Sequence, residues 1–221
     1  MKKAAVVFDM DGILFDTERI YIELWEGYAM RHGFPGGSEI MYRCIGTNSR
    51  ETKKIMQDAY GHLGFDYDSY IREVSAEFQE KYGDGRCPMK KGVNNLLSYL
   101  KENGAKVALA TSTARANAER MLKGAGIYQF FDELICGDMV SHSKPDPEIF
   151  LVACDKIGEK PEDVFIIEDS FNGIRAAYSA GAKALMVPDI LQPDEEIGGK
   201  SFKVMKDLDE VRDFFSQLEE S

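Results

Sequence analysis

Residues 4–17 read AAVVFDMDGILFDT, an apolar run that ends in two aspartates one residue apart. A continuous apolar run of this length is typical of a strand that is buried on both faces of a parallel sheet. Ligands of open α/β sheets bind just beyond the carboxyl ends of such strands, which is where Asp9 and Asp11 follow. In extended chain, side chains two residues apart point the same way, so the two carboxylates should converge. Because converging carboxylates are costly without a cation, we expect a hard divalent ion such as Mg²⁺ beside them.

An acidic turn after an ordinary strand would also explain Asp9, Asp11 and Gly12, because Asp and Gly are common turn residues. The longer pattern Asp-x-Asp-Gly-x-Leu-x-Asp-Thr over residues 9–17 is more specific. It resembles the first motif of the haloacid dehalogenase-like hydrolase superfamily. That resemblance predicts further motifs at the ends of the later strands.

Composition indicates an ordinary globular protein, with 44% hydrophobic and 29% charged residues in a chain of 221. The formal net charge of −11 argues against a nucleic-acid-binding protein. Four dispersed cysteines without a Cys-x-x-Cys pair indicate reduced thiols rather than a disulfide framework or a zinc site. No apolar stretch has the length of a signal-peptide core or a membrane span. We expect a cytoplasmic monomer that binds neither nucleic acid nor a membrane.

Strands and helices alternate along most of the chain. Apolar strands are predicted at residues 4–8, 106–110, 134–136, 164–167 and 184–187, and helical patterns lie between them. This alternation predicts right-handed crossovers and a parallel sheet. Residues 17–87 show only helical patterns. We therefore predict a Rossmann-like α/β core over residues 1–16 and 88–221, with an inserted α-helical cap domain over residues 17–87.

The second predicted strand is followed by Thr111, Ser112 and Thr113. A hydroxyl at a strand end, followed by the backbone amides that open a helix, suits a phosphate oxygen. The same residue could equally cap the next helix. In its position after the first motif, the segment resembles the superfamily's second motif. That resemblance implies that Thr111 and the Ser112 amide bind phosphate.

Residues 143–150 read SKPDPEIF, and the two prolines place the start of a helix at Pro147. A single surface lysine is usually only solvated. However, Lys-Pro-x-Pro-x-x-Phe resembles the third motif of the superfamily's β-phosphoglucomutase-like subgroup. There the lysine offsets charge between the nucleophilic carboxylate and the phosphoryl group, which implies this role for Lys144.

Residues 166–174 read IIEDSFNGI. Paired acids here could simply be favourable charges at a helix N-terminus. After the fourth strand, however, Glu168 and Asp169 would supply the oxygen ligands that a metal near Asp9 still needs. The segment also resembles the superfamily's fourth motif, Glu-Asp-Ser-x-x-Gly-Ile, in which the Asp ligates Mg²⁺ and the Glu lies beside or in its shell.

Together the four motifs imply a Mg²⁺-dependent phosphatase that hydrolyses a small phosphorylated metabolite, of the sugar or polyol phosphate class, through an aspartyl-phosphate. Asp9 would be the nucleophile, and Asp11 would be the general acid and then the general base. Asp9, Asp169, Glu168 and the backbone carbonyl of Asp11 would hold the magnesium ion. Gly12 would let the main chain approach the phosphate closely.

A sugar phosphomutase of the β-phosphoglucomutase type is the alternative. Such mutases carry a His beyond the Asp-Thr pair and a Lys before the cap glycine, where this chain has Tyr21 and Ile45. These departures favour hydrolysis. A third reading is a non-catalytic phosphometabolite-binding protein, which is disfavoured because Asp9, Asp11 and Asp169 are all present.

The inserted helices are expected to close over the substrate and to contact its leaving group. Trp25 is more simply part of the core of these helices than a ligand of the substrate. The candidates for leaving-group contacts are Tyr21, Trp25, Tyr42, Asn48 and Arg50.

Overall fold

The computed structural model describes residues 4–45, 47, 49–83 and 85–219. Over these residues the chain forms one six-stranded sheet in which every neighbouring pair is parallel. The strands, in the spatial order β3-β2-β1-β4-β5-β6, are β1 (Ala5–Phe8), β2 (Lys106–Thr111), β3 (Glu133–Cys136), β4 (Val164–Glu168), β5 (Lys183–Met186) and β6 (Lys203–Val204). The predicted Rossmann-like α/β class is confirmed.

Strand β1 lies at the centre of the sheet, between β2 and β4. Phe8 pairs with Leu109 on one side and with Ile167 on the other, so the three strands end almost level. The strand order reverses direction at β1, which is the place where open α/β sheets bind ligands. The residues that follow these three strands therefore emerge together at one edge of the sheet.

Both faces of β1 are buried, as its unbroken apolar run predicts. Val6 and Phe8 pack into one hydrophobic cluster, and Ala5 and Val7 pack into a second cluster across the sheet. The first cluster is covered by the helices α5 (Val93–Glu102), α6 (Arg115–Gly124) and α10 (Leu208–Glu219). The second cluster is covered by the helices α7 (Glu148–Ile157), α8 (Phe171–Ser179) and α9 (Glu195–Lys200).

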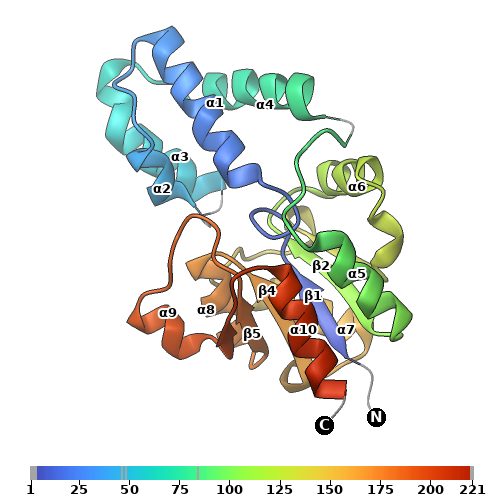
Figure 1. Cartoon of the computed structure of the whole chain (residues 1–221). Helices are drawn as coiled ribbons and strands as arrows, with labels where there is room; N and C mark the ends of the chain where they lie inside the picture. Colours follow the sequence, from blue (N-terminus) through green and yellow to red (C-terminus); the bar gives the residue numbers. More distant parts are fainter. Residues whose placement is uncertain (1–3, 46, 48, 84, 220–221) are drawn as a thin grey trace.

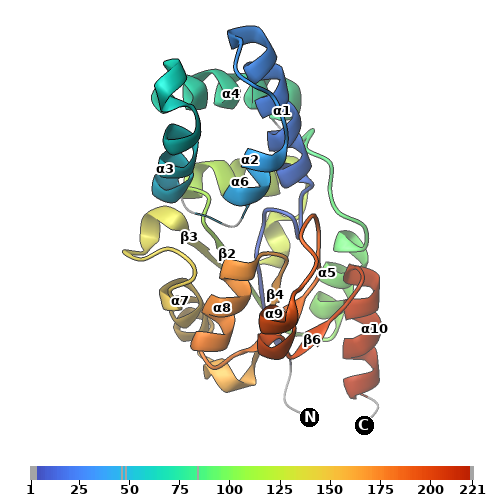
Figure 2. The same cartoon turned by 90° about the vertical axis from the view of Figure 1, so that its left-hand side faces the viewer.

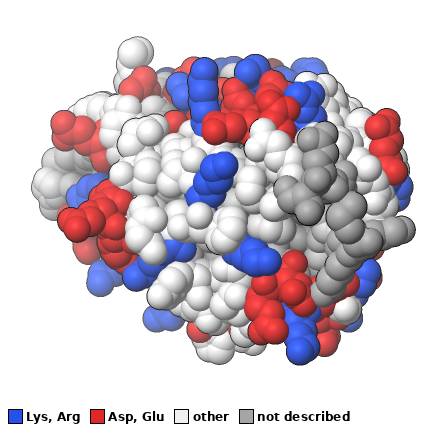
Figure 3. All heavy atoms as spheres, turned by 60° about the horizontal axis from the view of Figure 1, so that its bottom comes forward, with Lys and Arg blue, Asp and Glu red and all other residues white. Residues whose placement is uncertain are grey.

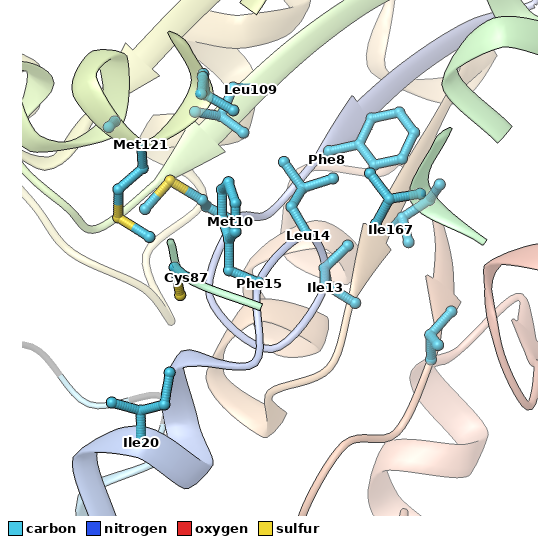
Figure 4. Close-up of a cluster of buried hydrophobic side chains, with 14 of the residues drawn as sticks. Phe8, Met10, Ile13, Leu14, Phe15, Ile20, Cys87, Leu109, Met121 and Ile167 are labelled. Carbon is cyan, nitrogen blue, oxygen red and sulfur yellow. The ribbon is translucent and has the colours of Figure 1, made fainter. Parts of the chain in front are cut away.

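The loop after β1 folds back on itself instead of continuing the strand. The Leu14 N–H donates to the Met10 carbonyl at 2.8 Å, and Gly12 has a positive φ of 77°. This turn buries the apolar side chains of Met10, Ile13, Leu14 and Phe15 in the hydrophobic core (Figure 4). Asp9 and Asp11 are thus carried on a tightly packed loop.

Four helices lie together beyond the carboxyl edge of the sheet (Figures 1 and 2). They are α1 (Thr17–His32), α2 (Glu39–Cys44), α3 (Ser49–Tyr60) and α4 (Tyr67–Tyr82), and we call them the helical layer. Trp25 is fully buried at the centre of the layer. Its ring lies 5.1 Å from that of Tyr60 and 5.6 Å from that of Tyr70, which makes Trp25 a packing residue.

The two connections between sheet and helical layer run side by side. Phe15 and Met89 form an antiparallel bridge. The Asp16 N–H donates to the Pro88 carbonyl, and the Lys90 N–H donates to the Leu14 carbonyl, both at 2.9 Å. The chain thus leaves and re-enters the sheet side of the molecule at one place.

Several elements differ from the sequence-based expectation. The strand β6 has two exposed residues and no apolar run, and α2 and α9 have six residues each, too few for a periodic pattern. Helix α7 begins at Glu148, one residue after the predicted start, because Pro147 is its N-cap. Four three-residue 3₁₀ helices are also present in the described chain, at Gly61–Leu63, Tyr128–Phe130, Gly137–Met139 and Pro161–Asp163.

The surface carries both charge signs. On the face seen in Figure 3, Lys and Arg side chains alternate with Asp and Glu, and no continuous basic stripe crosses the described part of that face. A basic stripe would be the electrostatic footprint of a nucleic-acid-binding protein. No helix within the described ranges has the length and hydropathy needed to cross a bilayer.

Candidate active site

Lys144 links three of the four motifs. Its ammonium Nζ lies 2.5 Å from Asp9 Oδ1 and 2.7 Å from Glu168 Oε1, and it donates to the Ala110 carbonyl at 3.2 Å. The lysine side chain is 5% exposed, and those of Asp9 and Glu168 are 10% and 1% exposed. Lys144 is therefore not the solvated surface lysine that a single Lys usually is.

Asp9, Glu168 and Asp169 form a buried acidic cluster, in which one carboxylate oxygen from each lies within 4.8 Å of the others. Burial raises the pKa of Asp9 to about 8, although the charge of Lys144 opposes this rise. Burial, followed by the charge of Glu168, raises the pKa of Asp169 well above its usual range. These shifts measure the cost of burying like charges together.

The charge deficit and the donor atoms of the acidic cluster fit a divalent metal ion. Lys144 pairs with Asp9 and Glu168, and it is the one cation paired with any of the three carboxylates among the described residues, so the fully ionised cluster keeps two uncompensated negative charges. Carboxylate oxygens are the ligands that Mg²⁺ prefers. Asp9, Glu168 and Asp169 could therefore hold the ion that the sequence predicts.

Two glycines let the backbone approach the acidic cluster. A Cβ built at Gly12 would overlap Asp169 Oδ2, and one built at Gly173 would overlap Glu168 Oε1. The resemblance implies that Gly12 serves a close approach to phosphate. In the structure, the close approach of Gly12 is to Asp169, and the positive φ gives a second reason for glycine there.

Asp11 has different surroundings from Asp9. Its Oδ1 accepts a hydrogen bond from Thr17 Oγ1 at 2.8 Å, and its Oδ2 accepts one from Thr113 Oγ1 at 2.9 Å. The Asp11 carboxylate does not belong to the acidic cluster within the described residues. The two carboxylates therefore do not share one set of partners, as the sequence-based expectation of convergence implied, because the chain is no longer extended at Asp11. A contact of the Asp11 backbone carbonyl with a metal stays a prediction.

Thr111 is fully buried at the end of β2. Its hydroxyl accepts from the Thr113 N–H at 3.1 Å and donates to Asp11 Oδ2 at 3.4 Å. Ser112 and Thr113 line the cleft described next, whereas Thr111 is absent from its described walls. The hydroxyl predicted to bind phosphate thus contacts Asp11 in this arrangement.

A cleft of about 710 Å³ lies between the carboxyl edge of the sheet and the helical layer. Asp9, Asp11, Lys144, Glu168 and Asp169 form part of its sheet side. On the helical side, its walls include Glu18, Tyr21, Ile45, Thr47, Arg50, Tyr67, Tyr70 and Ile71.

The predicted leaving-group residues divide between cleft and core. Tyr21 and Arg50 line the cleft, and the Tyr21 ring stacks on Phe78 at 5.2 Å. Trp25 and Tyr42 are not among the described lining residues. Asn48 lies outside the described residues.

Sequence reasoning missed several polar residues of the cleft. Thr17 belongs to the first motif and Thr113 lies two residues beyond the strand end at Thr111, so both had a signal in their position. Glu18 follows the first motif directly. Asn117 and Asp138 also line the cleft, but they carry no motif that would single them out.

The chain matches the protein family described as haloacid dehalogenase-like hydrolase over residues 6–187. It belongs to this family. The family predicted from the four motifs is thus confirmed.

Relatives of this haloacid dehalogenase-like hydrolase include named phosphatases. It is 34% identical over 181 residues to the phosphorylated carbohydrates phosphatase of Thermotoga maritima, covering 82% of this chain and 83% of the relative. It is 32% identical to the validoxylamine A 7'-phosphate phosphatase of Streptomyces hygroscopicus subsp. limoneus, covering 96% and 97%. The crystal structure of CbbY from Rhodobacter sphaeroides in complex with phosphate superposes with a TM-score of 0.75 at 25% identity, covering 95% of this chain and 96% of that one. The names of the two relatives agree with the predicted enzyme class, a phosphomonoester hydrolase.

Proposed function

We propose that this protein is a Mg²⁺-dependent phosphatase that hydrolyses a small sugar or polyol phosphate through an aspartyl-phosphate on Asp9. One observation carries the proposal, namely the different surroundings of two neighbouring aspartates at one cleft. Asp9 contacts Lys144 in the acidic cluster, and Asp11 is held apart by threonine hydroxyls. Carboxyl groups in different environments can take different catalytic roles.

In the first step, an Asp9 oxygen attacks phosphorus and the bond from phosphorus to the ester oxygen breaks. Asp11 donates a proton to the departing oxygen, so that the product leaves as an alcohol. Lys144 offsets the negative charge shared by Asp9 and the phosphoryl oxygens. A magnesium ion held by Asp9, Glu168, Asp169 and the Asp11 carbonyl would neutralise more of this charge.

In the second step, a water molecule attacks the phosphorus of the aspartyl-phosphate. Asp11 accepts a proton from that water, and the bond from phosphorus to the Asp9 oxygen breaks. Inorganic phosphate leaves and the Asp9 carboxylate is restored. We assign the phosphoryl oxygens to Lys144, the Ser112 amide and the open main chain at Gly12. Thr111 would join them after its hydroxyl rotates away from Asp11.

The helical layer is assigned as the major part of a cap over residues 17–87. Its position over the cleft suits the exclusion of water during phosphoryl transfer. The paired connections at Phe15 and Met89 offer one place about which such a cap could move. Tyr21 and Arg50, which line the cleft from this layer, would contact the leaving group.

Hydrolysis is favoured over phosphate transfer between two hydroxyls of one sugar. Tyr21 and Ile45 line the cleft where mutases would have His and Lys. None of the described residues around the cleft is a histidine. A direct test gives the purified enzyme β-glucose 1-phosphate with a trace of the bisphosphate. Faster formation of glucose 6-phosphate than of free phosphate would establish the mutase instead.

The main test measures phosphate release from a panel of sugar and polyol phosphates, with Mg²⁺ and with EDTA. We expect release only with Mg²⁺, and its loss in Asp9→Asn, because the amide keeps the shape of the carboxylate but does not attack phosphorus. Asp58→Asn on the exposed face of α3 is the matched control and should keep full activity. Undiminished turnover by a folded Asp9→Asn variant would end the aspartyl-phosphate proposal.

A further inference from the structure

Glu18 is a half-buried acid in the cleft that the mechanism above does not use. It lies in the first turn of α1, one residue after Thr17, and its side chain lines the cleft. Within the part of the chain that the structure describes, its carboxylate has no hydrogen-bond or ion-pair partner. A carboxylate in this position is costly unless a donor or a cation reaches it.

Acidic neighbours make the position of Glu18 more costly. Burial, followed by the charges of Asp11, Asp9, Asp189 and Glu168, raises the pKa of Glu18 to about 8. These acids repel a negative charge on Glu18, and a hydrogen-bond donor on a molecule bound in the cleft would offset part of that repulsion.

Two basic residues beside the first turn of α1 pair with other acids. Arg19, the next residue in the turn, lies 3.2 Å from Asp16 and 3.3 Å from Asp189. Lys90 contacts the same two acids, at 3.1 Å and 2.6 Å. Asp189 is thus already paired with Arg19 and Lys90. These two cations connect the first turn of α1 to other acids and form no ion pair with Glu18.

Glu18 lies beside Asp11 rather than in the acidic cluster. The cluster that could hold a metal comprises Asp9, Glu168 and Asp169, without Glu18, over the described residues. Among its neighbours, the charge of Asp11 acts most strongly on Glu18. Thr17 also ties this turn to Asp11 through the 2.8 Å hydrogen bond. Glu18 is therefore on the leaving-group side of the site, because Asp11 is the residue that protonates the departing oxygen.

We propose that Glu18 is a specificity residue that accepts a hydrogen bond from a hydroxyl on the carbon next to the phosphorylated carbon of the substrate. This inference rests on the proposed phosphatase function and narrows its substrate class to esters with a neighbouring hydroxyl. Above about pH 8, where Glu18 is ionised, the same carboxylate repels leaving groups that carry an acid at that carbon, such as phosphoglycolate. A site built to accept a hydroxyl also penalises a substrate that lacks one, because its acceptor then stays unpaired.

The test, run at pH 9 so that Glu18 is ionised, compares three esters, namely glycerol 3-phosphate, propyl phosphate and 1,3-propanediol monophosphate. The first carries the neighbouring hydroxyl, the second has none, and the third has its hydroxyl one carbon further away. For the native enzyme we expect kcat/KM to be about ten- to a hundredfold higher for glycerol 3-phosphate than for the other two, the effect of one hydrogen bond to a charged group.

In Glu18→Ala this preference should fall to within about threefold, while kcat/KM for propyl phosphate stays near that of the native enzyme. Glu18→Gln keeps an acceptor oxygen and should retain part of the preference, and it also serves if the alanine variant does not fold. Phosphoglycolate should become a better substrate in both variants. Glu23→Ala, on an exposed position of the same helix, is the matched control and should change none of these ratios.

Two results would overturn the proposal. One is a preference for glycerol 3-phosphate that survives in both Glu18 variants. The other is an equal loss for all three esters together with a higher half-saturating Mg²⁺ concentration, which would mean that Glu18 acts on the water around the metal ion. If the native enzyme releases phosphate from none of the esters in either test panel, the proposed function itself fails, and that outcome is distinct from the other two.

Discussion

Replacing Lys144 with methionine removes the positive charge that is buried between Asp9 and Glu168. The ammonium lies 2.5 Å and 2.7 Å from oxygens of these two residues, and the lysine is 5% exposed. Methionine keeps an unbranched side chain that can still pack on the ring of Phe150, which the lysine ammonium overlies at 4.9 Å. The substitution therefore tests the charge with little change of shape.

The expected loss follows from the burial of the two acids. Removing one partner of a buried ion pair costs about 3–5 kcal/mol. Loss of the Lys144 charge also raises the pKa of Asp9 further above about 8, because this charge opposes the effect of burial in the native protein.

The pH dependence of the loss follows from this carboxyl. Below about pH 8 it holds its proton in both folded proteins, whereas above about pH 8 the native carboxyl loses the proton and that of the variant keeps it. The free energy of unfolding of Lys144→Met, relative to the native protein, should therefore be constant below about pH 8 and fall by about 1.4 kcal/mol for each unit of rising pH above it.

Urea unfolding in EDTA at pH 7, 8 and 9 measures this difference without metal. Lys160→Met is the matched control, because Lys160 is 79% exposed and its Nζ is 4.0 Å from the nearest carboxylate, that of Glu162. The control should change stability by less than about 0.5 kcal/mol. A loss in Lys144→Met that is below 1 kcal/mol at pH 7, or that does not grow between pH 8 and pH 9, would refute the reasoning that these acids are desolvated and depend on one cation.

Three further predictions concern the proposed catalytic residues and the metal. Asp11→Asn should slow single-turnover phosphoenzyme formation from alkyl phosphates far more than from p-nitrophenyl phosphate, because only a basic leaving oxygen needs a proton. An equal loss of rate for both substrates would exclude Asp11 as the general acid. Gly12→Ala should lower the free energy of unfolding by about 1–2 kcal/mol, because alanine is strained in the left-handed backbone conformation of Gly12. It should also displace Asp169 and so raise the half-saturating Mg²⁺ concentration, whereas the control Gly36→Ala, whose added methyl group meets open space, should not. Mg²⁺ affinity measured by calorimetry should weaken as the pH falls below about 8, because protons compete with the metal ion for Asp9 and Asp169, whose pKa values are raised. A constant affinity from pH 6 to pH 8 would contradict this prediction.

The sequence predicted the sheet well because its strands are short, buried and apolar on both faces. Each predicted strand lies within one residue of an observed one at either end. Short elements without such a run, such as β6 and α2, were missed because two to six residues are too few to show a period.

The candidate site was predictable in part, because its motifs stand directly at strand ends. Parallel strands bring their carboxyl ends to one edge, so Asp9 and Glu168 meet although 159 positions separate them. Partners that lie away from strand ends were not predicted. Thr113 reaches Asp11 across 102 positions, and its hydroxyl is one of several near that strand end.

By itself, the sequence determined that a buried central strand ends in two aspartates and that four motifs stand at strand ends. Only the tertiary structure decided that these aspartates face different partners. The rule that side chains two residues apart point the same way holds only in extended chain, and β1 ends at Phe8. Beyond it, the turn closed by Leu14 and Met10 redirects Asp11 toward threonines from two other segments. The neighbours of each carboxylate are set by how distant segments pack, and no local pattern contains that information.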